Sequence, residues 1–460
     1  MTWFTGWNYR KSITISNTGS TLTDYQILTT IDTASLITAL KMRSDCGDIR
    51  CTDTDGSVLL NHWIESGCNT ISTKIWVKIP SVPTGTKTIY LYYGNPSSTY
   101  DNSLGGNNTF LFFDDFEDNS LDTTVRWNDV GGTNTESNGR LTVTPGTNLW
   151  RGGVQSKNNS FDNFILETSL KLPTNNNGAI MFRGSSDADW NTAYLIRRSG
   201  SGGVTDSQIF DRKPTAVSYI DLATTTINTT GTDFYRHKLV VNGNSIKLYI
   251  NESLALDATD STLASGNIGF SDYVPTGVLT AEFIFVRKYT SPEPISSIPG
   301  TEELPIGYLD ISSNPTDADI YTDSTFRGRT PSLLSLIVGP YNLKVSKTGY
   351  ADYTEPIIIT PGFTLTRSVG LTSLSHIAAT NVTLDHATPC IEGTCIVTAN
   401  VTWTNSGSGS GDFVPNIKIN GNIQTPIYPS QSLAAGASVT KSFSIIGLPI
   451  GTHTICPDPN

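Results

Sequence analysis

The feature that most constrains this chain is the alternation of apolar and polar residues, which recurs along its whole length. It is clear in residues 11–16, 73–79 and 245–250, and turn dipeptides such as Asn242-Gly243 stand between such segments. An alternation of period two predicts strands with one buried face, and Asn-Gly and Asp-Gly pairs favour tight hairpins. Only residues 33–40 have the spacing of a helix. We therefore expect an all-β protein.

The domain organisation follows from shifts in composition along the 460 residues. We predict four tandem β-sandwich domains with the boundaries 1–98, 110–290, 306–372 and 375–460. A segment rich in Pro and Ser, residues 291–299, separates the second domain from the third. This composition predicts a semi-stiff spacer.

Composition and charge limit the partners. The chain has 30 Lys and Arg against 41 Asp and Glu, a formal net charge of −11, and only 15% charged residues. This acidic balance argues against nucleic acid, which is bound by clustered Lys and Arg. No apolar run approaches about 18 residues, so we expect no membrane span. The first residues lack the basic and apolar parts of a secretory signal, yet the modular, polar composition favours an extracellular location, on a cell surface or a virion surface.

The cysteines divide equally between the first and the last predicted domain. Cys46, Cys51 and Cys68 lie in the first, and we expect a Cys46–Cys68 disulfide that leaves Cys51 unpaired. In the last domain Cys390–Cys395 and Cys395–Cys456 are rival pairings. The alternative is that all six thiols stay reduced. The sequons that make glycosylation candidates are Asn107, Asn158, Asn228, Asn251, Asn381 and Asn400.

The first domain resembles a bacterial and archaeal domain of unknown function that occurs in large surface proteins. The resemblance is carried, in order, by residues 7–15, 48–50, 53–56, 62–65, 75–80 and 89–96. It implies no chemistry. Asp53 and Asp55 suit Ca²⁺ because it prefers oxygen ligands, but a polar hairpin turn is the interpretation we favour.

The second domain resembles the concanavalin A-like, or laminin-G-like, jelly roll. The residues that carry this resemblance include 112–117, 139–143, 161–168, 179–183, 234–239 and 266–270. The fold is shared by lectins, adhesion modules and glycosidases, so it does not fix the function. The Glu-x-Asp-x-Glu strand of the related retaining glucanases is absent. Because glycoside hydrolysis needs two carboxylates, we expect no catalytic residues and no enzyme.

Two candidate sites follow within the second domain. Some jelly-roll members hold a structural Ca²⁺ near their first strand, and Asp114 and Asp115 occupy that place, so calcium is the only cofactor we consider. A sugar site would combine an aromatic platform with nearby amide or carboxylate groups. The residues that fit are Asp187, Asp189, Trp190, Asn191 and Tyr194, with Trp150 as a further candidate.

The last two domains resemble modules of bacterial and archaeal surface proteins. Residues 307–353 resemble the PEGA domain, which implies a small β-sandwich without catalytic residues. Residues 377–456 resemble immunoglobulin-like, adhesion-related modules, but one strand fewer than the usual seven is apparent. An unpaired edge beside residues 438–456 predicts completion by a strand from a neighbouring subunit, and a tolerated truncation is the alternative.

Three functions are compatible with these features of the sequence. The first is a non-enzymatic structural or adhesive protein of a cell surface, filament or virion appendage, whose partners are other copies or other surface proteins. The second is a carbohydrate-binding protein that acts through the jelly roll, with glycans as partners. The third, a secreted glycosidase, lacks a convincing carboxylate pair.

Overall fold

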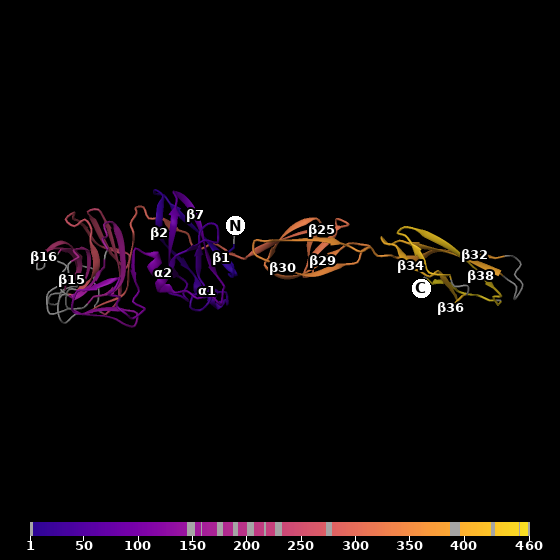
Figure 1. The fold of residues 1–460 in the computed structure, drawn as a ribbon, viewed down its shortest axis with the longest axis horizontal. Coiled ribbons are helices and arrows are strands. Elements are labelled where there is room, and N and C mark those ends of the chain that lie inside the picture. The colour runs from indigo at the N-terminus through magenta and orange to yellow at the C-terminus, as the bar shows by residue number, and fades with distance from the viewer. Residues whose placement is uncertain are drawn as a thin grey trace. The chain divides into compact units, whose positions relative to one another are not determined.

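The computed structural model describes residues 3–144, 152–157, 159–172, 178–186, 192–199, 207–215, 218–225, 232–272, 278–386, 396–424, 428–449 and 451–458. The chain forms two compact units, Met1–Leu304 and Pro305–Asn460 (Figure 1). Among the described residues only α1 (Thr33–Thr38) and α2 (Asn102–Thr109) are α-helical, and the other elements are strands. The expected all-β class is confirmed. Neither helix is long and apolar enough to span a bilayer.

The first domain is built from two facing sheets. The strands are β1 (Tyr9–Asn17), β2 (Leu22–Ile31), β3 (Arg50–Thr52), β4 (Leu59–Leu60), β5 (His62–Ser66), β6 (Thr73–Val82) and β7 (Gly85–Tyr93). One sheet has the order β2-β6-β5, and the other contains β1-β7-β3-β4. Alternate side chains such as Ile13, Ile27 and Val77 fill the space between them. A disulfide joins Cys46 to Cys68, and Cys51 is a buried free thiol, which is the arrangement that the sequence predicts.

The segment rich in Pro and Ser does not act as a spacer. Its strand β23 (Ile295–Ser296) and the strand that follows the segment, β24 (Glu302–Glu303), pair antiparallel with β1 of the first domain. Arg10 forms an ion pair with Glu303 at 2.8 Å, and Glu302 accepts hydrogen bonds from Lys41 and the Tyr93 hydroxyl. The expectation of a spacer was wrong because these pairs and the open backbone edge of β1 hold the segment in the sheet.

The second domain is a jelly roll of two large sheets. Its strands are β8 (Phe112–Asp114), β9 (Trp127–Asp129), β10 (Thr133–Glu136), β11 (Leu141–Thr144), β12 (Gly152–Ser156), β13 (Phe164–Lys171), β14 (Ala179–Gly184), β15 (Ala193–Ser199), β16 (Ser207–Thr215), β17 (Ser218–Thr225), β18 (Tyr235–Asn242), β19 (Ser245–Ile250), β20 (Ser253–Thr259), β21 (Asn267–Asp272) and β22 (Leu279–Lys288). The first sheet has the order β10-β11-β22-β13-β18-β19-β20, with β8 beside β22. The second has the order β17-β16-β15-β14-β21-β12-β9. Their facing sides bury one large apolar core that includes Phe116, Trp127 and Phe164.

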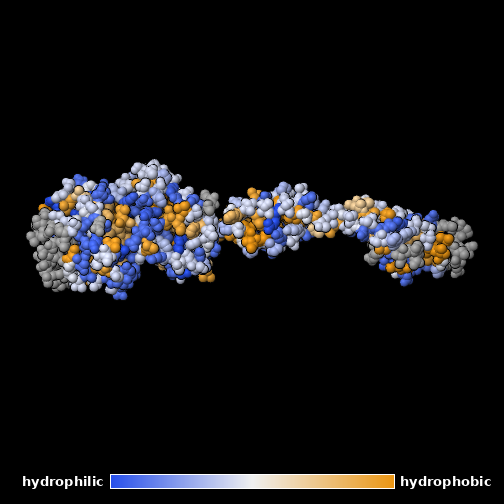
Figure 2. Space-filling view, viewed as in Figure 1, coloured by the Kyte–Doolittle hydropathy of each residue, from blue (hydrophilic) through white to orange (hydrophobic). Residues whose placement is uncertain are grey.

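The second unit begins with the PEGA-like domain. Its strands are β25 (Ile306–Asn314), β26 (Asp319–Thr322), β27 (Thr325–Arg329), β28 (Ser332–Ile337), β29 (Gly339–Ser346), β30 (Tyr353–Ile359) and β31 (Thr364–Gly370). The sheets β28-β25-β31 and β27-β26-β29-β30 enclose a core that contains Leu309, Ile320 and Val345. Several apolar side chains, among them Ile358 and Phe363, stay on its surface, where orange patches are visible in Figure 2.

The last domain contains β32 (Ile377–His386), β33 (Ile396–Asn405), β34 (Gly411–Phe413), β35 (Asn416–Ile419), β36 (Asn422–Ile423), β37 (Gln431–Leu433), β38 (Ser438–Ile446) and β39 (Ile455–Asp458). Trp403 lies at the centre of its core. Residues 455–458 pair with β35, so the chain forms a strand closer to its end than the sequence suggests. Within the described residues β38 pairs only with β33, and it therefore ends its sheet. The immunoglobulin-like assignment and the strand addition stay predictions.

Candidate functional site

Most of the predicted sugar-binding residues lie outside the part that the structure describes. These are Asp187, Asp189, Trp190 and Asn191, together with Trp150. The segment that carries the first four connects β14 to β15, and its base is well defined. The Ser185 amide donates to the Thr192 carbonyl at 2.8 Å, and the Thr192 amide donates to the Ser185 hydroxyl. The described residues Ser185 and Thr192, on either side of the candidates, are therefore joined by two hydrogen bonds.

Tyr194 lies directly after this base and is fully buried. Its ring packs against Phe182 with the centroids 5.3 Å apart, and its hydroxyl donates to Asp260 Oδ1 at 2.5 Å. Burial and the hydrogen bond to Asp260 raise the pKa of Tyr194 to about 12. The prediction that Tyr194 offers a platform to a sugar is wrong, because its ring belongs to the core. Tyr194 instead anchors β15 to the loop that carries Asp260.

A buried arginine fixes the other side of the hairpin base. Arg183, one residue before the end of β14, has a left-handed backbone (φ 46°), a conformation that is uncommon outside glycine. Its guanidinium donates to the carbonyl oxygens of Asp162, Gly243 and Leu263. These acceptors lie on three separate loops, so one side chain joins the end of β14 to all three.

The outer side of the seven-stranded sheet is apolar at its centre. Ile180 and Phe182 of β14 point into the core, whereas Ala179 and Met181 point the other way. With Ala193 of β15 and a neighbouring leucine they form a second, separate buried cluster. In this part of the described face no carboxylate stands among the central side chains of β14 and β15.

The two aspartates considered for calcium are engaged by donors. Asp114 accepts a hydrogen bond from Trp127 Nε1 at 2.6 Å and forms an ion pair with Arg126 at 3.0 Å. Asp115 accepts from the Ser103 hydroxyl instead, so the two carboxylates do not share a site. Within the described residues no group of three or more His, Cys, Asp or Glu side chains is placed to hold a metal. The donor set around Asp114 therefore does not fit a cation.

The other predicted positions in the described residues are turn, ion-pair and surface residues. Asp55 accepts from the amides of Ser57 and Val58, which is the polar hairpin turn that we favoured over calcium, and Asp53 pairs with Lys87. The sequon residues Asn107, Asn251 and Asn381 are exposed, Asn400 is half-buried, and Asn158 and Asn228 lie outside the described residues. Cys390 and Cys395 also lie outside them, and Cys456 is exposed.

Charged and aromatic side chains meet at the seam between the two domains of the first unit. Its apolar part is an aromatic cluster of Trp63 and Trp76 from the first domain with Phe110, Phe113 and Phe285. The Trp76 and Phe285 centroids are 5.3 Å apart in an edge-to-face arrangement. Aromatic pairs in this geometry contribute free energy beyond that of the area they bury. This cluster therefore stabilises the packing of the jelly roll against the first domain.

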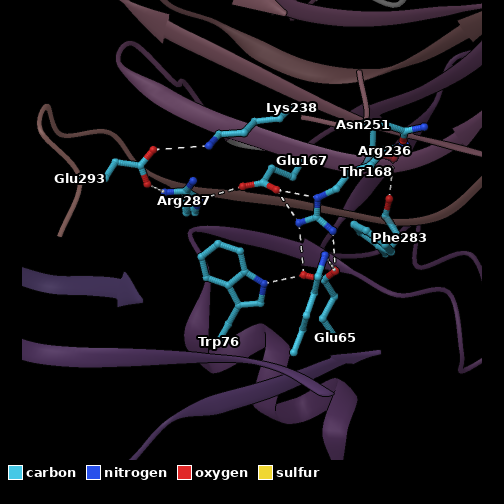
Figure 3. A network of polar contacts seen from close by, with 11 residues as sticks. Glu65, Trp76, Glu167, Thr168, Arg236, Lys238, Asn251, Phe283, Arg287 and Glu293 are labelled. Atoms are coloured by element: carbon cyan, nitrogen blue, oxygen red, sulfur yellow. Dashed lines mark hydrogen bonds and ion pairs between the residues drawn. The ribbon is translucent and has the colours of Figure 1, made fainter. Parts of the chain in front are cut away.

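Beside the aromatic cluster runs a chain of ion pairs, which we call the seam network: Glu65, Arg236, Glu167, Arg287 and Glu293 (Figure 3). Arg236 bridges Glu65 and Glu167, and Arg287 bridges Glu167 and Glu293. Burial alone would raise the pKa of Glu167, but the charges of Arg287 and Arg236 outweigh it and lower that pKa. Sequence reasoning missed this network, although charged residues on otherwise apolar strands are a signal for it.

Comparisons with known families agree with three of the four domains. Residues 45–130 match the domain of unknown function DUF2341, residues 108–281 match the 3-keto-alpha-glucoside-1,2-lyase-like domain, and residues 306–374 match the PEGA domain. None of these matches covers half of the chain. The first match extends into the jelly roll, across the boundary that composition predicts. No curated protein matches the chain.

Solved structures similar to this chain include a carbohydrate-binding module and two glucanases. A carbohydrate-binding module from Bacillus subtilis is 19% identical, with 38% of this chain and 97% of that chain covered and a TM-score of 0.24. An endo-β-1,3-glucanase from Pyrococcus furiosus is 14% identical, with 40% and 95% covered and a TM-score of 0.32. A β-glucanase from Bacillus licheniformis is 15% identical, with 39% and 98% covered and a TM-score of 0.31. At these values they carry no conclusion about function.

Proposed function

We propose that this protein binds carbohydrate through its jelly-roll domain. The observation that carries the proposal is the match of residues 108–281 to the 3-keto-alpha-glucoside-1,2-lyase-like domain. The described residues on either side of the Trp190 segment support it, because Arg183 is anchored to Gly243 and Tyr194 to Asp260. An aromatic platform for a sugar benefits from a fixed position, because ordering a mobile ring on binding costs free energy and lowers the affinity.

We propose binding rather than hydrolysis. A glycosidase needs two carboxylates placed across the sugar. The apolar cluster around Met181 and Ala193 occupies the centre of the described outer face, and this arrangement supports a non-catalytic role. The name of the matching family points to glucosides as the first ligands to try.

The other domains suit the presentation of such a site at a surface. A PEGA domain is consistent with an extracellular location. The structural or adhesive role, on a cell surface, a filament or a virion, stays a prediction. The edge strand β38 is the described feature that an assembly through strand addition would use.

The test is a glycan array probed with the full chain and with Trp190→Ala, including α- and β-glucosides. We expect a subset of glycans to bind the full chain and to lose at least about tenfold in affinity with Trp190→Ala. Trp3→Ala, which alters a half-exposed tryptophan of the first domain, is the matched control and should bind normally. Silence across the array, or equal loss in both variants, would contradict the proposal.

A further inference from the structure

The largest sheet of the last domain has two outer edges, and they differ in their protection. The sheet has the order β32-β33-β38, so within the described residues one edge of β32 and one edge of β38 lack a neighbouring strand (Figure 1). Such edges expose backbone N–H and C=O groups to which another strand is able to pair. Lys and Pro on the edge, and charged side chains that point inward, are common features that prevent this pairing.

The edge of β38 carries protection of this kind. Lys441 lies opposite Val401, which is fully buried, so the lysine belongs to the inner face of the sheet. The Tyr428 hydroxyl donates to the backbone carbonyl of Ser442 at 2.7 Å and occupies one acceptor of the strand. Two copies of β38 would each bring a lysine and no carboxylate to their contact. This strand therefore does not suit pairing with itself.

The edge of β32 lacks these features. The strand, Ile377–His386, contains neither Lys nor Pro. Val382 lies opposite Val401, which is fully buried. Leu384 lies opposite Ala399, which is also fully buried, so both side chains point toward the inner face. Val382 and Leu384 are nevertheless 39% and 58% exposed. An added strand at this edge would cover them.

The sequence of β32 is complementary to itself in the antiparallel direction. A bulge between Ala379 and Asn381 shifts the alternation by one residue and leaves four apolar side chains on the inner face: Ile377, Ala379, Val382 and Leu384. In an antiparallel pair of two copies with Thr380 opposite Asn381, Ile377 lies opposite Leu384. In the same register Ala379 lies opposite Val382. Every inner side chain of one copy then meets an apolar side chain of the other.

The same register also matches the charges. His376 directly precedes β32, Asp385 lies near its end, and both are exposed. With Thr380 opposite Asn381, His376 of each copy lies opposite Asp385 of the other. An imidazole N–H donates to a carboxylate whether the ring is neutral or protonated. Pairs of this kind directly across two antiparallel strands stabilise the pairing, and two-fold symmetry forms the pair twice.

We infer that β32 is an interface at which two copies of this chain pair antiparallel, edge to edge, and join their two three-stranded sheets into one. The second copy is the occupant that the strand's own apolar and charged residues fit. The inference goes beyond the proposed function, because it concerns the last domain and not the jelly roll. A dimer would carry two jelly-roll domains, and binding through both would raise the avidity for a surface.

The test is analytical ultracentrifugation of the full chain over a range of concentrations, in a Cys456→Ser background because the exposed thiol would otherwise cross-link chains. We expect a reversible equilibrium between monomer and dimer. Leu384→Lys places a charge on the inner face of the edge, as Lys441 does on β38, and should raise the dimer Kd at least about tenfold. Ile446→Lys, which alters a more exposed residue of β38, is the matched control and should leave the Kd unchanged.

An exchange of the two charged residues tests the register. His376→Asp alone places carboxylates opposite each other, and Asp385→His alone leaves no carboxylate for the imidazole. Each should raise the dimer Kd about threefold or more. The variant with both changes restores the opposite pair and should return the Kd to that of the parent. Its recovery would show that the single variants lose the contact and not the fold.

A chain that stays monomeric up to about 1 mM would overturn the inference. A dimer that Leu384→Lys leaves intact would overturn it as well. A dimer that Ile446→Lys disrupts instead would place the contact at β38 and have the same consequence. Failure of the charge exchange to restore the dimer would exclude the register from which the interface is inferred.

Discussion

The seam network allows a quantitative prediction for Glu167. Its side chain is 3% exposed and stands between two guanidinium groups, with Arg287 Nε at 3.0 Å. At this distance a pair of unit charges contributes about 5.5 kcal/mol at an effective dielectric constant of 20. In Glu167→Gln both arginines keep another carboxylate, Glu65 for Arg236 and Glu293 for Arg287. We therefore expect a loss near the lower end of the usual range for broken buried pairs, about 3 kcal/mol.

The assay is urea unfolding followed by tryptophan fluorescence. Of the eight tryptophans only Trp403 lies in the second unit, so a Trp403→Phe background reports the first unit alone. The matched control is Glu293→Gln, since this carboxylate also pairs with Arg287 but is 38% exposed. Its loss should stay below about 1 kcal/mol, as for exposed pairs. A loss below about 1 kcal/mol in Glu167→Gln, or equal losses in both variants, would refute the reasoning.

The pH dependence of this effect has a definite sign. The folded protein lowers the pKa of Glu167, so its stabilising contribution is present above the unfolded value of about 4.3 and is lost as the pH falls. The difference between the wild-type protein and Glu167→Gln should therefore shrink below about pH 4. A difference that is constant from pH 7 to pH 3 would mean that the charge of Glu167 does not cause the stabilisation.

Three further predictions concern the first unit. Cys46→Ser with Cys68→Ser should lower its free energy of unfolding by about 3 kcal/mol, as expected for a loop closed across 22 residues, and melting with and without reductant checks this. Glu302→Ala should expose the chain around residues 297–303 to limited proteolysis, because β24 loses Lys41; unchanged cleavage would contradict the pairing. Burial and Asp118 raise the pKa of Glu136 to about 8, so the stability of the folded state should fall as the pH rises from about 4.5 to 8, and Glu136→Gln should flatten that slope.

The alternation of apolar and polar residues was sufficient to predict the strands. Residues 11–16, 73–79 and 245–250 lie within β1, β6 and β19, because a sheet with one buried face imposes the period of two on its sequence. The Cys46–Cys68 disulfide could also be predicted, because the two residues flank one local strand pair.

Contacts between residues that are distant in sequence could not be predicted. Glu167 is neutralised by Arg236 and Arg287, which lie 69 and 120 positions away along the chain. No local sequence pattern predicts these ion pairs. The burial of Tyr194 was not predicted, because its hydrogen-bond partner Asp260 lies on a loop that is distant in sequence. The segment 291–299 shows the same limit, because its composition predicts a semi-stiff spacer but not the pairing of β23 with β1.

The central claim is that the jelly roll binds carbohydrate without cleaving it, and isothermal titration calorimetry of the full chain with the strongest glycan from the array tests it most directly. A binding protein gives heats that decline to baseline as the sites fill, and Trp190→Ala should abolish them. Heat that continues after each injection, with release of shorter sugars, would mean turnover and would contradict the account.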